Sequence, residues 1–257
     1  MALSVDHDAG TFVRRIGVLG LADLSGQRHG HQANRRRVLR PERIVLDIAM
    51  SPRDFPAPVW FVAALIPMVA SQILRLQQSD PAIWIFWDYA GRLGSLAMLA
   101  AIPSIRTVAF RWEKLQIALW EAALWIGGLV LADHYLGGWI RRAINAALPA
   151  TVLGTYPKLS GWLYFVDVVF GIALVAYNEE IVFRRCARHI FKIYFGDGYG
   201  LVIITSLLFG AYHWWTGLGN IVEAVMMGVL LMLFLQRSAA LWPVVLGHYL
   251  VDIADFA

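Results

Sequence analysis

Long apolar runs follow one another from Val59 to the end of the chain, each close to the length of a membrane-spanning helix. A helix needs about 20 apolar residues to cross a bilayer. The helical pattern of the fourth run continues through 179–195 and stops at the Gly-Asp-Gly sequence of 196–198. The pattern predicts an all-α fold, a polytopic transmembrane bundle of about seven to eight helices. The runs are 59–76, 82–102, 115–136, 161–178, 200–217, 220–236 and 240–256.

Two segments depart from this pattern. Residues 1–55 are basic, polar and poor in aromatic side chains, so we expect a mobile segment that precedes a transmembrane domain at 56–257. Met50 stands just before the first apolar run, and we interpret it as an alternative physiological start. Residues 138–158 combine a short amphipathic stretch with two prolines, which predicts an interfacial position.

Composition favours lipid over a large soluble core. Of the 257 residues, 59% are hydrophobic, whereas soluble domains contain about 45–50%. The 11 Trp and 9 Tyr residues fit aromatic belts at two membrane interfaces. The net charge of +4 comes largely from arginine. In a membrane protein such charge fits cytoplasmic loops facing anionic lipid, so no nucleic-acid partner is predicted.

The distribution of basic residues predicts an orientation. The positive-inside rule assigns the loops richest in Lys and Arg to the cytoplasm. Arg106, Arg111 and Lys114 mark one such loop, and the segment 184–192 marks another. Basic residues at 141–158 oppose this assignment. We expect a multi-pass protein of the inner membrane of a bacterium, with its N-terminus in the cytoplasm.

Ionisable residues interrupt three of the C-terminal apolar runs. A charged side chain at the centre of a bilayer costs about 2.5–3.5 kcal/mol on insertion scales. Three such interruptions within a short stretch therefore indicate function, and carboxylates with imidazoles are the groups that activate a water molecule. The residues are Glu179, Glu180 and Arg184 in the first run, His213 in the second, and His248 and Asp252 in the third.

Helical spacing predicts which of these side chains meet. Glu180 and Arg184 are four residues apart, so they lie side by side, while the adjacent Glu179 points about 100° away and is left to face the bundle. His248 and Asp252 have the same spacing. Each feature has a structural alternative: a solvated helix end for the first cluster, a buried core histidine for His213, and an interhelical clip for the third cluster.

A similar pair, Asp88 and Arg92, interrupts the second run at four-residue spacing. We interpret it as a structural clip between helices. Asp133 stands near the end of the third run, and Asp255 follows the last cluster at the expected membrane edge.

Together the motifs EExxxR (179–184), FxxxH (209–213) and HxxxD (248–252) resemble those of the CPBP family. These are the CAAX-protease and bacteriocin-processing membrane proteins, also called Abi. The resemblance covers roughly 160–257. Asp252 stands where many members have Asn.

The resemblance implies a glutamic-type intramembrane endopeptidase, with a membrane-associated or prenylated peptide or protein as its substrate and the lipid bilayer as its surroundings. It implies the following catalytic roles: Glu179 activates water, Glu180 and Arg184 orient it, His213 stabilises the oxyanion, and His248 and Asp252 complete the polar cavity. No cofactor follows from the sequence with certainty. A divalent metal such as zinc is chemically possible, with Glu179, His213 and His248 as its ligands.

Two other classes of function stay open. A non-catalytic membrane scaffold or bacteriocin-immunity protein would keep the motifs as a structural polar network. A transporter with a buried proton relay would need a water-filled path and usually an internal repeat, and the sequence shows no repeat.

Overall fold

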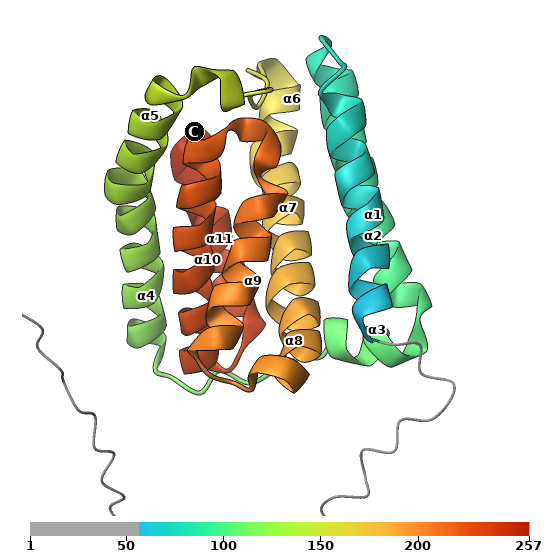
Figure 1. The fold of residues 1–257 in the computed structure, drawn as a ribbon, viewed down its shortest axis with the longest axis vertical. Helices are drawn as coiled ribbons and strands as arrows, with labels where there is room; N and C mark the ends of the chain where they lie inside the picture. Colours follow the sequence, from blue (N-terminus) through green and yellow to red (C-terminus); the bar gives the residue numbers. More distant parts are fainter. Residues whose placement is uncertain (1–56, 257) are drawn as a thin grey trace, which may run out of the picture. The chain divides into compact units, whose positions relative to one another are not determined.

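A computed structural model describes residues 57–256, and every regular element among them is helical (Figure 1). The all-α prediction is therefore confirmed for this range. The predictions for 1–55 and for Met50 lie outside the described residues. The α-helices are α1 (Ala57–Arg75), α2 (Pro81–Ala101), α3 (Pro103–Ala109), α4 (Leu119–Leu131), α5 (Gly138–Ala147), α6 (Gly161–Val166), α7 (Ile172–Glu179), α8 (Ala187–Phe195), α9 (Tyr199–Tyr212), α10 (Leu218–Ser238) and α11 (Leu241–Phe256).

Three π-helical segments join consecutive α-helices without a break. They are η2 (Ala132–Gly137) between α4 and α5, η4 (Asp167–Gly171) between α6 and α7, and η5 (Glu180–Cys186) between α7 and α8. The predicted continuation of the fourth run to residue 195 is confirmed, because α8 ends at Phe195 and Gly196 follows with φ 64°. π-Segments are rare and often occur at functional sites.

Helix α7 and the segment η5 occupy the position that organises the bundle. Helix α7 contacts α2 and α11, and η5 contacts α1, α3, α9 and α11. Helices α1 and α2 pack on each other as an antiparallel pair, as do α9 and α10 (Figure 1). A core of buried apolar side chains, among them Phe183, Phe209 and Phe234, joins these helices. The fold therefore brings α2, α7, α9 and α11 around one interior region.

The close approach of α9 and α10 depends on Gly210. A Cβ atom at this position would meet the Val225 side chain and would lie 2.8 Å from the Ile221 carbonyl oxygen. Glycine lets the two backbones approach, and this contact fixes the end of α9 that precedes His213.

One described helix, α10 (Leu218–Ser238), is long and apolar enough to cross a membrane by itself. Two shorter apolar helices are found at Val59–Arg75 and Tyr199–Tyr212. The predicted number of spans is therefore not confirmed. The physical reason lies partly in the π-segments and 3₁₀ turns, which divide the longer helical runs into shorter α-helices.

Candidate active site

Glu179, Glu180 and Arg184 are all buried, with 2% or less of each residue exposed. The solvated helix end considered as an alternative is therefore wrong for these residues. Glu179 is the last residue of α7, and the other two lie in η5. As the spacing predicts, the two carboxylates point to different partners.

Glu179 pairs with an arginine of another helix. Arg92 of α2 donates a hydrogen bond from Nη1 to Glu179 Oε1 at 2.8 Å. The same guanidinium donates from Nε to Asp88 Oδ2 at 3.0 Å, and Asp88 also pairs with Arg75 of α1. Glu179 Oε2 is buried and has no hydrogen-bond partner among the described residues. The predicted Asp88–Arg92 pair is thus present, and it extends to the first motif.

Glu180 points in a different direction from Glu179 and contacts His248 of α11. Its Oε1 lies 2.8 Å from His248 Nδ1, and its Oε2 lies 3.2 Å from Arg184 Nε. The Arg184 guanidinium covers the ring of Phe209, with Cζ 3.9 Å from the ring centroid. A carboxylate can only accept here, so Glu180 orients the His248 ring with Nδ1 as the donor.

This arrangement directs Nε2 of His248 toward the carboxylates of Glu179 and Asp252. His248 Nε2 lies 3.9 Å from Glu179 Oε2 and 3.6 Å from Asp252 Oδ2. Both distances are longer than a direct hydrogen bond. A water molecule within reach of these three side chains would fill their hydrogen-bonding capacity.

His213 follows the last residue of α9, and its ring is held by its own helix. Nδ1 lies 2.9 Å from the Phe209 carbonyl oxygen, which can only accept a hydrogen bond. Nδ1 therefore carries the proton, and in a neutral ring Nε2 is an acceptor. The Phe209 ring lies edge-on to His213 and His248, with centroids 4.8 and 5.9 Å away.

The motifs meet at a cavity of about 550 Å³. Glu179, His213, His248 and Asp252 line it, whereas Glu180 and Arg184 lie behind His248 and Phe209 and do not line it. The structure thus brings together all six residues singled out in the sequence. It separates four that face the cavity from two that hold the others in place.

A zinc ion at Glu179, His213 and His248 stays a prediction, and in this structure His248 Nε2 and Glu179 Oε2 are 3.9 Å apart. Zinc bonds of about 2.0–2.1 Å to N and O place tetrahedral ligand atoms roughly 3.4 Å apart. The group of possible metal ligands found among the described residues is Asp133, Glu223 and Asp255, and it does not include Glu179, His213 or His248. In addition, Glu179 Oε1 and His248 Nδ1 already have partners.

The wall of the cavity includes residues that sequence reasoning did not single out. Tyr156 precedes α6 in a loop, and its hydroxyl lies 2.8 Å from Asp167 Oδ2. Tyr89 donates to Asp167 Oδ1 at 2.6 Å. Burial, and after it the charge of the Asp88 carboxylate, raises the pKa of Tyr156 above its ordinary value. Local spacing carries no signal for this cluster, because its members come from three separate segments.

The family comparison matches the segment that carries the motifs. Residues 159–254 match the model described as "Type II CAAX prenyl endopeptidase Rce1-like". This segment is similar to the CAAX protease family. The match supports the resemblance to CPBP proteins that the motifs indicate, and it begins just before α6. No curated protein and no solved structure matches the chain. The three motifs, at 179–184, 209–213 and 248–252, all lie within the matched segment.

Proposed function

We propose that this chain is an intramembrane endopeptidase of the CAAX protease type, which hydrolyses a peptide bond of a membrane-associated or prenylated protein. One observation carries the proposal: Glu179, His213 and His248, from three separate helical segments, line one cavity. A scaffold would need no cavity at the place where these groups converge. Similarity to the family supports protease chemistry in general.

Glu179 is the general base of the proposed mechanism. Arg92 binds Oε1 and leaves Oε2 as the oxygen that faces His248 Nε2 at 3.9 Å. A water held between them transfers a proton to Oε2 as its oxygen attacks the scissile carbonyl carbon. Glu179 then returns this proton to the leaving amine, which breaks the C–N bond. No step passes through a metal ion.

His213 stabilises the oxyanion in this proposal, and its tautomer sets a condition on that role. Because the Phe209 carbonyl accepts from Nδ1, Nε2 can donate to an oxyanion when the ring carries both protons. His248, oriented by Glu180, and Asp252 complete the polar wall.

The rest of the molecule fits a lipid-embedded enzyme. Large apolar side chains are exposed around the bundle, including Trp112, Trp120, Trp139 and Trp162, each at least 64% exposed. Apolar residues also line the cavity beside the polar groups, among them Val175, Met227 and Leu231. We propose that the helices form a multi-pass bundle in the inner membrane of a bacterium, and that the apolar wall accepts the lipidated or hydrophobic part of the substrate.

Cleavage of a farnesylated CAAX reporter peptide by purified protein in detergent tests this function. Glu179→Gln keeps the shape of the side chain and removes the base, so cleavage should fall by about 10²-fold or more. Glu121→Gln, at the start of α4, is the matched control and should keep wild-type activity. Thermal unfolding checks that both variants fold. Wild-type cleavage by folded Glu179→Gln would contradict the role of Glu179 as the base. Absence of cleavage by the folded wild type would favour the alternative, a non-catalytic scaffold or immunity protein.

A further inference from the structure

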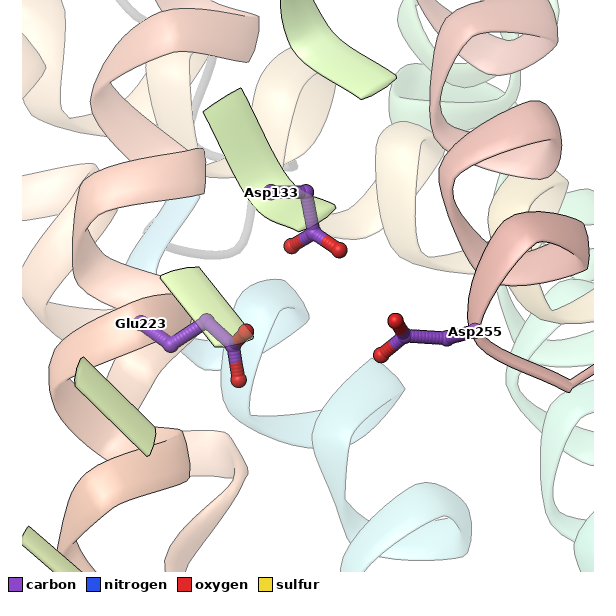
Figure 2. Close-up of side chains that lie close together, drawn as sticks. All are labelled: Asp133, Glu223 and Asp255. Carbon is purple, nitrogen blue, oxygen red and sulfur yellow. The ribbon is translucent and has the colours of Figure 1, made fainter. Parts of the chain in front are cut away.

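A second group of acids lies in the wall of the same cavity, and the proposed chemistry does not use it. Asp133 of η2, Glu223 of α10 and Asp255 of α11 direct their carboxylates toward a common space (Figure 2). One oxygen of each lies within 4.8 Å of the others. Asp133 and Glu223 are buried, and Asp255 is exposed. The group is thus open to solvent on one side.

Asp133 has no partner for its charge. It is 5% exposed, yet no hydrogen bond and no ion pair within 4.0 Å reaches it from the described residues. Glu223 is 6% exposed, and its Oε1 is also without a hydrogen-bond partner among those residues. A buried carboxylate without a counter-charge is strongly unfavourable. These oxygens therefore indicate a missing cationic ligand.

One arginine neutralises part of the group. Arg141 lies 2.6 Å from Asp255 Oδ2 and 3.3 Å from Glu223 Oε2. It makes no ion pair with Asp133, and Glu223 Oε1 accepts no hydrogen bond from the described residues. Within ion-pair distance, three carboxylates face one guanidinium, and Arg142 lies farther away in the wall of the same cavity.

Glycine at position 137 allows the backbone of η2 to lie close to the unpartnered oxygens of Asp133 and Glu223. A Cβ atom at Gly137 would lie 2.8 Å from Glu223 Oε1 and 3.3 Å from Asp133 Oδ1. Any larger residue at this position would displace the Glu223 carboxylate. Glycine in η2 therefore permits the approach of α10 that forms the group.

We propose that Asp133, Glu223 and Asp255 bind a hard divalent cation of the size of calcium. Carboxylate oxygens are the ligands that such cations prefer. Oxygens on opposite sides of Ca²⁺, at about 2.3–2.6 Å each, are roughly 4.6–5.2 Å apart, whereas those around Mg²⁺ are at most about 4.2 Å apart. The three oxygens lie within 4.8 Å of one another, which calcium can accommodate without movement of the helices. The site ties η2, α10 and α11 together at the cavity that holds His248.

Calcium binding to the full-length protein in detergent tests this site. After treatment with EGTA, we expect CaCl2 to bind saturably in isothermal titration and to raise the thermal unfolding temperature, and MgCl2 to bind more weakly. Asp255→Asn, at an exposed position, and Asp133→Asn should each weaken calcium binding by about tenfold or more. Glu113→Gln, in the loop before α4, is the control and should bind as the wild type does.

The outcomes separate this site from the protease proposal. Because binding and unfolding are measured without substrate, they stand whether or not the protein cleaves a peptide. Absence of saturable calcium binding to the wild type would overturn the site. Equal calcium binding by Asp255→Asn and the wild type would also overturn the site. So would a rise in unfolding temperature with a basic peptide and none with calcium.

Discussion

Arg92 Nη1 donates a hydrogen bond to Glu179 Oε1 at 2.8 Å, across 87 positions of the chain. Both residues are buried, and Arg92 also pairs with Asp88. The α1–α2 pair lies outside the segment matched by the CAAX protease family. The interaction joins this pair to Glu179, which lies inside that segment. The N-terminal helices thus take part in shaping the site rather than merely packing around it.

Replacement of Arg92 by Met should damage both stability and cleavage. The substitution leaves Glu179 buried without its counter-charge, and breaking a buried pair costs about 3–5 kcal/mol. We expect a clearly lower unfolding temperature in detergent and strongly reduced cleavage of the reporter peptide.

The matched control for this prediction is Arg111→Met. The Arg111 side chain is 70% exposed and pairs with Glu113, and exposed pairs contribute about 1 kcal/mol or less. Its variant should unfold and cleave as the wild type does. If Arg92→Met were as stable and active as Arg111→Met, the pair would have no role in holding Glu179.

Glu180 should affect the reaction through His248 and not through direct contact with substrate. Glu180→Gln keeps the size of the side chain but weakens its hold on His248 Nδ1, 2.8 Å away. Loss of such an orienting partner typically costs about 10–100-fold. We expect kcat for the reporter peptide to fall by that factor while KM changes little, because Glu180 does not line the cavity.

A pH profile distinguishes positioning from a purely structural role. If Glu180 orients His248, Glu180→Gln should change the shape of the kcat profile against pH, and Glu180→Asp should partly restore it. A substitution that only reduces the amount of correctly folded enzyme would lower the apparent kcat at every pH and leave the shape of the pH profile unchanged. An unchanged kcat for Glu180→Gln would contradict the positioning role.

Helical spacing predicted the local part of the site. The Asp88–Arg92 and Glu180–Arg184 pairs follow from the i, i+4 geometry of a helix, and both are present at 3.0 and 3.2 Å. The contact of Glu180 with His248 joins separate helices, so no local pattern reveals it.

The contacts that sequence did not predict depend on where helices cross and where they change their winding. The segments η2 and η5 carry Asp133 and Glu180, and a π-turn redirects the side chains that follow it. Apolar periodicity does not detect such turns. The acid group of Asp133, Glu223 and Asp255 was missed because its members come from three different runs, so no local spacing links them.

Gly210→Ala should separate α9 from α10 and disturb His213. The added methyl group would meet Val225 and lie 2.8 Å from the Ile221 carbonyl oxygen, so a backbone must shift. Overpacking of this kind costs about 1–3 kcal/mol. We expect a lower unfolding temperature and reduced cleavage.

Gly128→Ala in α4 makes the same chemical change where a Cβ atom would meet nothing within 4 Å. It should raise stability by up to about 1 kcal/mol, because alanine favours the helix more than glycine does. Thermal unfolding of the two variants side by side checks the sign. A stabilised Gly210→Ala would show that the α9–α10 contact is looser than described.

Single-cysteine labelling can locate the mouth of the cavity relative to the membrane. Lys114 precedes and Thr155 follows the continuous helical run 119–147, so they stand at opposite ends of it, and both are exposed. Thr155 also lines the cavity, which places the mouth of the cavity at the Thr155 end of this helical run. The native Cys186 is 0% exposed and should not react.

We predict that a membrane-impermeant maleimide labels Thr155→Cys in intact spheroplasts and labels Lys114→Cys after permeabilisation alone. The basic residues around Lys114 favour the cytoplasmic side for that loop, so the cavity would open on the outer face. Unmodified protein, with Cys186 as its single cysteine, is the control and should stay unlabelled. Labelling of both variants from one side would contradict a membrane-spanning 119–147 run. Reversed labelling would place the N-terminus outside and open the cavity to the cytoplasm.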